Sequence, residues 1–133
     1  MREENGDQFG QSVSISNDGK MIAVGAVMND GDIRVDSGHV RIYHLEEDDG
    51  TRWEQIGQDI NGEAANDWSG WSVSLSADGM TVAIGSPDNY DNGDAWNVSG
   101  QVRVYRIDGQ GSSWERLGQV IYGNTRMIIL GGL

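Results

Sequence analysis

The chain has 133 residues, which is enough for one folded unit with a hydrophobic core. Its 21 acidic and 9 basic residues give a net charge of −12, which argues against binding to nucleic acid, because that binding requires clustered cations. No stretch is long and apolar enough to cross a bilayer, so no membrane insertion is expected. Twenty glycines, one proline and no cysteine indicate many sharp turns without disulfides, which favours short strands over helices.

Four short strands are predicted in the first half of the chain. Residues 12–16 (SVSIS) alternate apolar and serine side chains, the period of two that is typical of a strand. An Asn-Asp-Gly turn signal follows at 17–19, since glycine adopts the positive φ of a tight hairpin without a Cβ clash. A second strand is predicted at 21–27. After an acidic loop, two more are predicted at 39–45 (HVRIYHL) and 52–60 (RWEQIGQDI).

The second half of the chain repeats this pattern. SVSISNDGKMIAVG begins at Ser12, and SVSLSADGMTVAIG begins at Ser72, 60 positions later. GHVRIY returns as GQVRVY after 62 positions, and RWEQIG returns as SWERLG after 61 positions. The changes of offset fall between the matching blocks, so these gaps are predicted to be loops.

A repeated unit of four consecutive antiparallel strands is the blade of a β-propeller. We therefore predict an all-β fold of two four-stranded blades in tandem, a partial β-propeller. The blade-like repeats are predicted at 1–62 and 63–123, with a divergent tail at 124–133. The alternative is that all eight strands form a single β-sandwich, which regular strand spacing also permits. The internal repeat favours blades, because a repeated unit stacks on its own copy.

Several short motifs resemble those of a known repeat. Residues 9–10 (FG) stand where the FG-GAP repeat has FG, and residues 25–27 (GAV) and 85–87 (GSP) stand where it has GAP. GHVRIY and GQVRVY resemble its G-x-V-x-V-Y strand. Over nearly its whole length the chain is therefore similar to the FG-GAP repeat, the blade unit of the integrin α-chain propeller, although Ser69-Gly70 replaces FG in the second copy. The resemblance implies an adhesion or recognition module of an extracellular or cell-surface protein.

The resemblance also raises the question of calcium. Integrin-type repeats carry a calcium loop between their first two strands, but SNDGKM and SADGMT are too short to wrap an ion that takes about six to eight oxygen ligands. The acidic loop between the second and third strand of each repeat is the other candidate site. Its candidate calcium ligands are Asp30, Asp32, Asp36, Asp88, Asp91 and Asp94. The alternative is that these residues shape solvated turns, since Asp, Asn and Gly are also what tight turns need.

Five tryptophans suggest carbohydrate binding, because indole faces stack on sugars. Trp53 and Trp114 occupy the same place in both copies and are predicted to pack between the blades. Trp68, Trp71 and Trp96 have no counterpart in the first copy, so they are the candidate ligand-binding residues. The alternative is that an exposed aromatic residue covers a blade that lacks its neighbour.

The remaining chemistry-bearing residues indicate no reaction. His39 and His44 are five residues apart on one predicted strand and face opposite ways, so neither is expected to bind zinc. No nucleophile motif accompanies them, so no catalytic residue and no enzymatic activity are predicted. Asn97 begins an Asn-Val-Ser acceptor sequence for N-glycosylation, which is consistent with a surface position in a secreted protein.

We expect a non-catalytic module that recognises a protein or a glycan. One alternative is a calcium-dependent, lectin-like carbohydrate-binding domain that uses the candidate tryptophans, and another is a hydrolase that uses two carboxylates of an acidic loop. Rings typically take about four to eight blades, so two blades leave two faces unpaired. The chain is therefore expected either to be part of a longer repeat array or to form a homo-oligomer.

Overall fold

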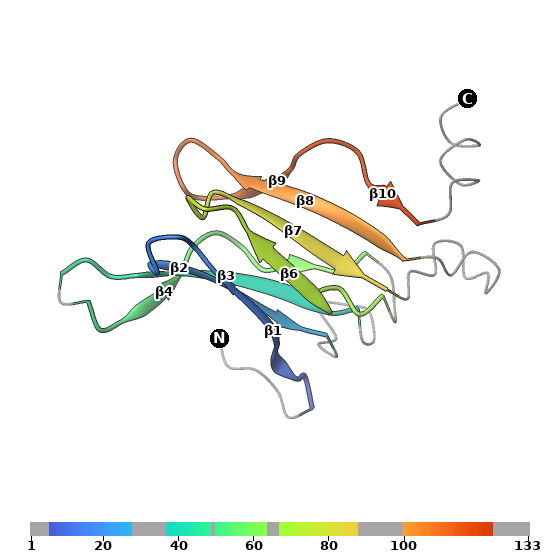
Figure 1. Cartoon of the computed structure of the whole chain (residues 1–133), viewed down its shortest axis with the longest axis horizontal. Coiled ribbons are helices and arrows are strands. Elements are labelled where there is room, and N and C mark those ends of the chain that lie inside the picture. The colour runs from blue at the N-terminus through green and yellow to red at the C-terminus, as the bar shows by residue number, and fades with distance from the viewer. Residues whose placement is uncertain (1–5, 28–36, 49, 64–66, 88–99, 124–133) are drawn as a thin grey trace.

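The computed structural model describes residues 6–27, 37–48, 50–63, 67–87 and 100–123, and over these ranges the chain forms strands, turns and loops but no helix. Two antiparallel β-sheets lie face to face as two layers (Figure 1). The first sheet consists of β1 (Phe9–Ile15), β2 (Met21–Ala26), β3 (His39–Leu45), β4 (Trp53–Gln55) and β5 (Ile60–Asn61). The second sheet consists of β6 (Ser72–Leu75), β7 (Thr81–Ser86), β8 (Gln101–Ile107), β9 (Trp114–Arg116) and β10 (Ile121–Tyr122).

Each sheet has four strand positions, and the last position is divided. In the first sheet the order is β1-β2-β3-β4, and β5 also pairs with β3. In the second sheet β6, β7 and β8 follow in order, and both β9 and β10 pair with β8. The single fourth strand predicted at 52–60 is therefore broken in two. The break includes Gly57, which has a φ of +75° and contacts the indole of Trp114 from the other sheet.

The pairing keeps the two copies of the repeat in separate sheets. Among the described residues, the ladders join strands of the same copy, and one isolated parallel bridge between Gly38 and Ser69 links the two sheets. The predicted all-β fold is confirmed. Its sheets have the arrangement of two neighbouring propeller blades that do not close a ring.

The turn between the first two strands has the same shape in both copies. Gly19 and Gly79 have φ values of +77° and +76°, as the Asp-Gly turn signal predicts. A carboxylate oxygen of Asp18 accepts a hydrogen bond from the Lys20 N–H at 2.9 Å and another from the Ser16 hydroxyl at 2.8 Å. The bond from Lys20, followed by that from Ser16, lowers the pKa of Asp18 below its ordinary value of 3.8. This carboxylate closes the turn.

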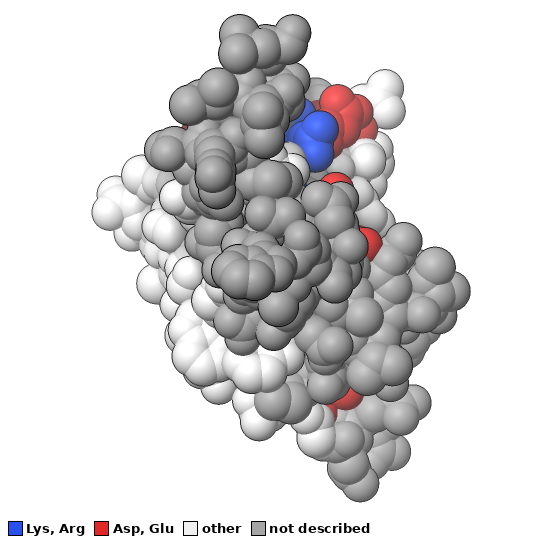
Figure 2. Space-filling model, turned by 90° about the vertical axis from the view of Figure 1, so that its right-hand side faces the viewer, with Lys and Arg blue, Asp and Glu red and all other residues white. Residues whose placement is uncertain are grey.

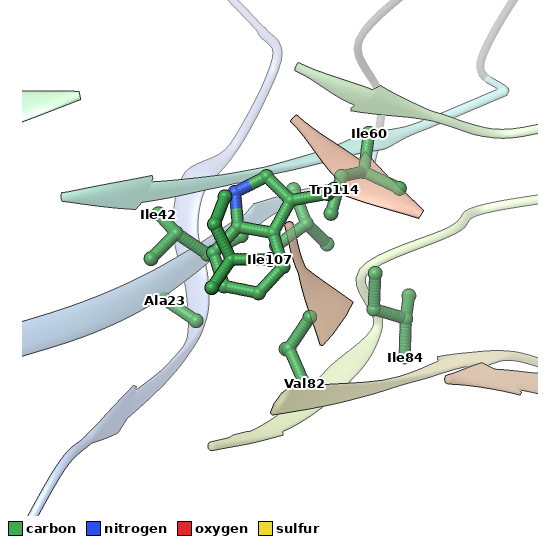
Figure 3. Packing of buried hydrophobic residues seen from close by; sticks show 8 residues of the cluster. Ala23, Ile42, Ile60, Val82, Ile84, Ile107 and Trp114 are labelled. Atoms are coloured by element: carbon green, nitrogen blue, oxygen red, sulfur yellow. The ribbon is translucent and has the colours of Figure 1, made fainter. Parts of the chain in front are cut away.

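The core lies between the two sheets (Figure 3). Side chains alternate along a strand, so one side of β2 and β3 faces the second sheet while the other side faces away from it. The buried residues of the core are Ala23, Val40, Ile42 and Ile60 from the first sheet and Val82, Ile84, Ile107 and Trp114 from the second. Burial of each large apolar side chain is worth about 1.5–3 kcal/mol. Packing of one repeat on the other is therefore a main source of stability.

We expect Gly79→Ala to destabilise the chain more than Gly19→Ala. Both replacements put a Cβ at positive φ, which costs about 1 kcal/mol or more. At Gly19 the added Cβ meets no atom within 4 Å, whereas at Gly79 it lies 2.5 Å from Cγ of Met21 in the first sheet. Thermal unfolding of the two variants measures the difference. Equal melting temperatures, or no loss in either variant, would contradict this turn geometry.

Candidate functional site

The backbones of the two sheets meet where the Ser69-Gly70 turn inserts against the first sheet. Ser69 forms the parallel bridge with Gly38, and the Ser12 hydroxyl donates a hydrogen bond to the Gly70 carbonyl at 2.6 Å. Glycines permit this approach, because a Cβ on Gly25 would overlap the Gly70 carbonyl oxygen and a Cβ on Gly38 would overlap the Ser69 backbone. The first sheet therefore receives a turn of the second repeat in a groove that has no side chains at these two positions.

Trp114 is the second anchor between the sheets. It is 3% exposed, and its indole N–H donates to the Ile56 carbonyl at 2.9 Å. The side-chain amide of Gln58 donates to the Trp114 carbonyl and accepts from the Trp114 N–H, both at 2.9 Å. A Cβ on Gly57 would lie 2.5 Å from the indole, so glycine leaves the space that the ring fills. The prediction that Trp114 packs between the blades is confirmed.

The side of the first sheet that faces away from the second sheet is mainly apolar, and several of its side chains are exposed. The register places Val13 opposite Val24 and Ile15 opposite Ile22, and Val13 and Ile15 are 60% and 57% exposed. We call this surface the first open face. Its residues are Phe9, Val13, Ile15, Ile22, Val24, Tyr43, Leu45 and Trp53.

The prediction that Trp53 packs between the blades is wrong. Trp53 is the counterpart of Trp114, but it pairs with Leu45 on the first open face and is 43% exposed. Trp114 belongs to the second repeat and packs on the first repeat, which precedes it in the sequence. The described part of the chain holds no such repeat before Trp53, so its indole has no sheet to contact.

The side of the second sheet that faces away from the first carries a cavity of about 300 Å³. Its lining includes Trp71, Ser72, Gly85, Gly100, Val102 and Ile121. We call this surface the second open face. We count with it Leu117, Gly118 and Gln119, which join β9 to β10 and are the counterparts of the Ile56–Gln58 segment that contacts Trp114. Figure 2 views the molecule from the side on which β7 ends and β8 begins in Figure 1. Most of the described residues visible from this side are neither acidic nor basic.

Two of the three candidate ligand-binding tryptophans lie together at this cavity. The rings of Trp68 and Trp71 are stacked, with centroids 5.9 Å apart and planes 17° apart. Trp71 is exposed and lines the cavity, whereas Trp68 is half-buried. The indole N–H of Trp68 is buried and has no acceptor among the described residues. Trp96 lies outside the described residues.

Comparison with known families identifies the first copy of the repeat. Residues 3–43, which include β1, β2 and most of β3, match the family model described as the FG-GAP repeat. This segment of the first repeat is therefore similar to an FG-GAP repeat. No curated protein matches the chain. In the part of the chain that the structure describes, no helix is long and apolar enough to span a bilayer.

The loop residues proposed for calcium and for glycosylation fall outside the described ranges of both repeats. The candidate ligands are Asp30, Asp32, Asp36, Asp88, Asp91 and Asp94, and the candidate acceptor is Asn97. Calcium binding and glycosylation therefore stay predictions. The short turn that replaces the calcium loop of integrin-type FG-GAP repeats is described, and there the Asp18 carboxylate bonds to its own turn.

One cluster of potential ligands was missed by the sequence reasoning. Ligand atoms of His44, Glu46 and Glu54 lie within 4.8 Å of one another where β3 and β4 pair in the first sheet. The pKa of Glu46 is raised, chiefly by a hydrogen bond with the Glu54 carboxyl group and also by burial. His44 and Glu54 lie opposite each other because of the β3–β4 register, which cannot be read from the sequence alone. Exposed acidic groups are common without an ion, so we assign no metal to the cluster.

The outward side of the first sheet also holds a partly buried ion pair. Arg41 is opposite Val24, and its guanidinium donates to the two carboxylate oxygens of Asp59 at 3.0 and 3.3 Å. The Gln55 amide donates to the same carboxylate at 2.6 Å. Burial alone would raise the pKa of Asp59, but the hydrogen bonds from Arg41 and Gln55 outweigh it and lower this pKa below 3.8. The carboxylate therefore stays charged at neutral pH and holds β3 to the segment before β5.

We expect Asp59→Asn to lower the free energy of unfolding at pH 7 by about 1 kcal/mol, a modest value because the Asp59 side chain is partly exposed. The lowered pKa means that the carboxylate stabilises the fold above pH 3.8 and loses this effect as the pH falls through its folded-state value. Urea unfolding of both proteins at pH 7 and at pH 3 measures the difference. A difference that stays constant between the two pH values would contradict the assigned role.

Proposed function

We propose that the chain is a non-catalytic, β-propeller-type recognition module of an extracellular or surface protein and that it binds a protein partner. The FG-GAP match at residues 3–43 supports this class of module, since FG-GAP repeats are typical of adhesion and surface proteins. The observation that carries the proposal is the first open face, which combines exposed aliphatic residues with an exposed indole.

The first open face has the chemistry of a protein-binding surface. Val13, Ile15 and Trp53 are among the most exposed large apolar side chains of the described residues, and the register sets them on one side of one sheet. Contiguous exposed apolar patches mark interaction sites, because single exposed apolar residues are normal but a continuous apolar surface is costly in water. Aromatic anchors such as Trp53 are enriched among the residues that dominate interface energies.

We expect Val13→Asp to reduce binding to a protein partner at least about tenfold, because it puts a charge into an apolar contact. The measurement is binding of the purified chain to an array of purified extracellular protein domains, on which the chain itself is one of the domains. Gln110→Asp, which adds the same charge in the exposed β8–β9 turn, is the matched control and is expected to bind like the original chain. Absence of any bound domain, or equal binding of both variants, would overturn the proposal.

A second candidate function is glycan binding at the Trp68–Trp71 stack. One face of the Trp71 ring packs on Trp68, and Trp71 borders the cavity of the second open face. An exposed indole that is held at a fixed orientation is a suitable platform for a sugar ring. This is the lectin-like alternative, and the acidic loops are its proposed source of calcium.

We expect Trp71→Ala to abolish glycan binding and Trp53→Ala to leave it unchanged. The two side chains are similarly exposed, at 46% and 43%, so the pair separates a specific stacking site from general loss of exposed indole. A glycan array probed with each variant, with and without EDTA, gives the result. Binding that is equal in the two variants would exclude the stack, and binding that resists EDTA would exclude the calcium-dependent form.

A further inference from the structure

The two open faces are the two halves of the interface that already exists inside the chain. The first open face carries Val13, Ile15 and Trp53, whose counterparts Val73, Leu75 and Trp114 pack between the sheets. The second open face carries the counterparts of residues that the first sheet buries. Val102 and Ile121 are 37% and 55% exposed, whereas Val40 and Ile60 are 0% and 4% exposed.

The turn at the start of β1, from Gln8 to Gln11, already has the shape of the turn that inserts. Gln8 and Trp68 are the non-glycine residues with positive φ among those described, at 60° and 55°. Gly10 and Gly70 follow at 97° and 95°, and in both turns the last N–H donates to the first carbonyl, at 3.0 and 3.1 Å. The Phe9-Gly10 turn is therefore preorganised like Ser69-Gly70, and its phenyl ring is exposed.

The second sheet offers the groove that this turn fits. Gly85 and Gly100 are the counterparts of Gly25 and Gly38, whose missing side chains admit the Ser69-Gly70 backbone. A Cβ on Gly85 would meet only atoms of Ser72, so no other segment of the described chain occupies the groove at this position, whereas a Cβ on Gly100 would lie 3.1 Å from the Pro87 carbonyl oxygen, where the chain's own backbone borders the groove. The cavity of about 300 Å³ lies at this place. Ser72 is the counterpart of Ser12, which holds the inserted turn by its hydroxyl.

A docking place for an indole is also present on the second open face. Gly57 and Gln58 hold Trp114, and their counterparts are Gly118 and Gln119. Gly118 has a φ of +78°, close to the +75° of Gly57, and an added Cβ there would meet no atom within 4 Å. The second open face therefore offers a place for an indole, and the first open face carries Trp53, whose indole contacts no second sheet within the described chain.

We propose that the partner of the first open face is the second open face of another copy of this chain. The Phe9-Gly10 turn of one copy enters the groove beside Gly85 and Gly100 of the next, and Trp53 lies against Gly118 and Gln119. This inference rests on the proposed function, because it names the protein that the open face recognises. A second copy is the chosen occupant since one chain carries both halves, in the same order and with the same turn geometry as the interface within it. Such a head-to-tail contact forms a ring if its rotation closes and an open chain if it does not.

Charge gives the association a defined dependence on salt. Each copy carries a net charge of −12, so two copies repel each other at low ionic strength. Salt screens this repulsion, whereas it leaves apolar burial intact or strengthens it. Association is therefore expected to be stronger at 0.5 M than at about 0.05 M sodium chloride, the reverse of a contact made by ion pairs.

Sedimentation velocity of the purified chain over a range of concentrations tests the proposal. We expect the average sedimentation coefficient to rise with concentration and to rise more steeply at high salt. Trp53→Glu, which alters one face, and Val102→Asp, which alters the other, are each expected to remain monomeric, while the control Gln110→Glu associates normally. All three sites are exposed, and circular dichroism confirms that each variant is folded. Gln119→Ala, a milder change, is expected to weaken association about fivefold through loss of the amide contacts to the partner backbone.

Mixing the two monomeric variants gives the decisive result. Each retains one intact face, so an equimolar mixture of Trp53→Glu and Val102→Asp is expected to form a heterodimer and nothing larger. A mixture that stays monomeric, or an original chain that stays monomeric at all concentrations and salt levels, overturns the proposal and leaves an attached neighbouring repeat or a different protein as the occupant. If the chain stays monomeric but binds a domain on the array through Val13, this inference fails and the proposed function stands; if it also binds no domain, both fail.

Discussion

The structure depends on a close backbone approach between two sheets that only glycine permits. Gly25 and Gly38 leave a groove in the first sheet, and the Ser69-Gly70 turn fills it. Side chains at the glycine positions would push the sheets apart, and the apolar layer between them would then open to water. The approach also brings β6 next to the serines of β1, so the Ser14 hydroxyl accepts the Leu75 N–H at 2.9 Å. Glycines and serines thus set the spacing of the sheets, and aliphatic residues and Trp114 fill the space that this spacing defines.

The two copies show that burial is a property of position in the array and not of residue type. Val40 is fully buried and Val102 is exposed, although the two residues occupy equivalent positions in the first and the second copy of the repeat. Trp53 and Trp114 also differ in exposure, but here the residue of the second repeat is the buried one. Each repeat has one face with a glycine-lined groove that can receive a turn and another face with a turn of the shape that enters such a groove. At each end of the described array, one half of this interface is therefore formed without its counterpart among the described residues.

Much of this fold could be predicted from the sequence, because the same pattern of strands and turns occurs in both halves of the chain. The Asp-Gly turns, the alternation in β1 and β6 and the separation of the copies into two sheets all followed from local pattern and period. The break of the fourth strand could not be read in the same way, since Gly57 and Gly118 leave the ladder at positive φ in both sheets, although an indole from the other sheet lies only against Gly57 among the described residues. The direction in which each tryptophan packs was also absent from the pattern. The repeat identifies Trp53 and Trp114 as equivalent, but only the packing shows which neighbour each of them needs. The Trp68–Trp71 stack and the His44, Glu46 and Glu54 cluster likewise depend on turn geometry and strand register.

The contact that we propose between copies uses the counterparts of the residues that pack within the chain, and we expect it to be the weaker of the two. Inside the chain the two units are tethered at high effective concentration, so each buried apolar side chain adds its about 1.5–3 kcal/mol to stability directly. Between separate copies the same contacts must first offset about 4–15 kcal/mol of lost translational and rotational freedom, and a net charge of −12 on each copy adds repulsion. A few side chains such as Trp53, Val102 and Ile121 gain about as much as this cost, so we expect the proposed contact between copies to be reversible and to respond to concentration and salt. Reversibility matters for a recognition module, because a face that is permanently covered has nothing left to recognise.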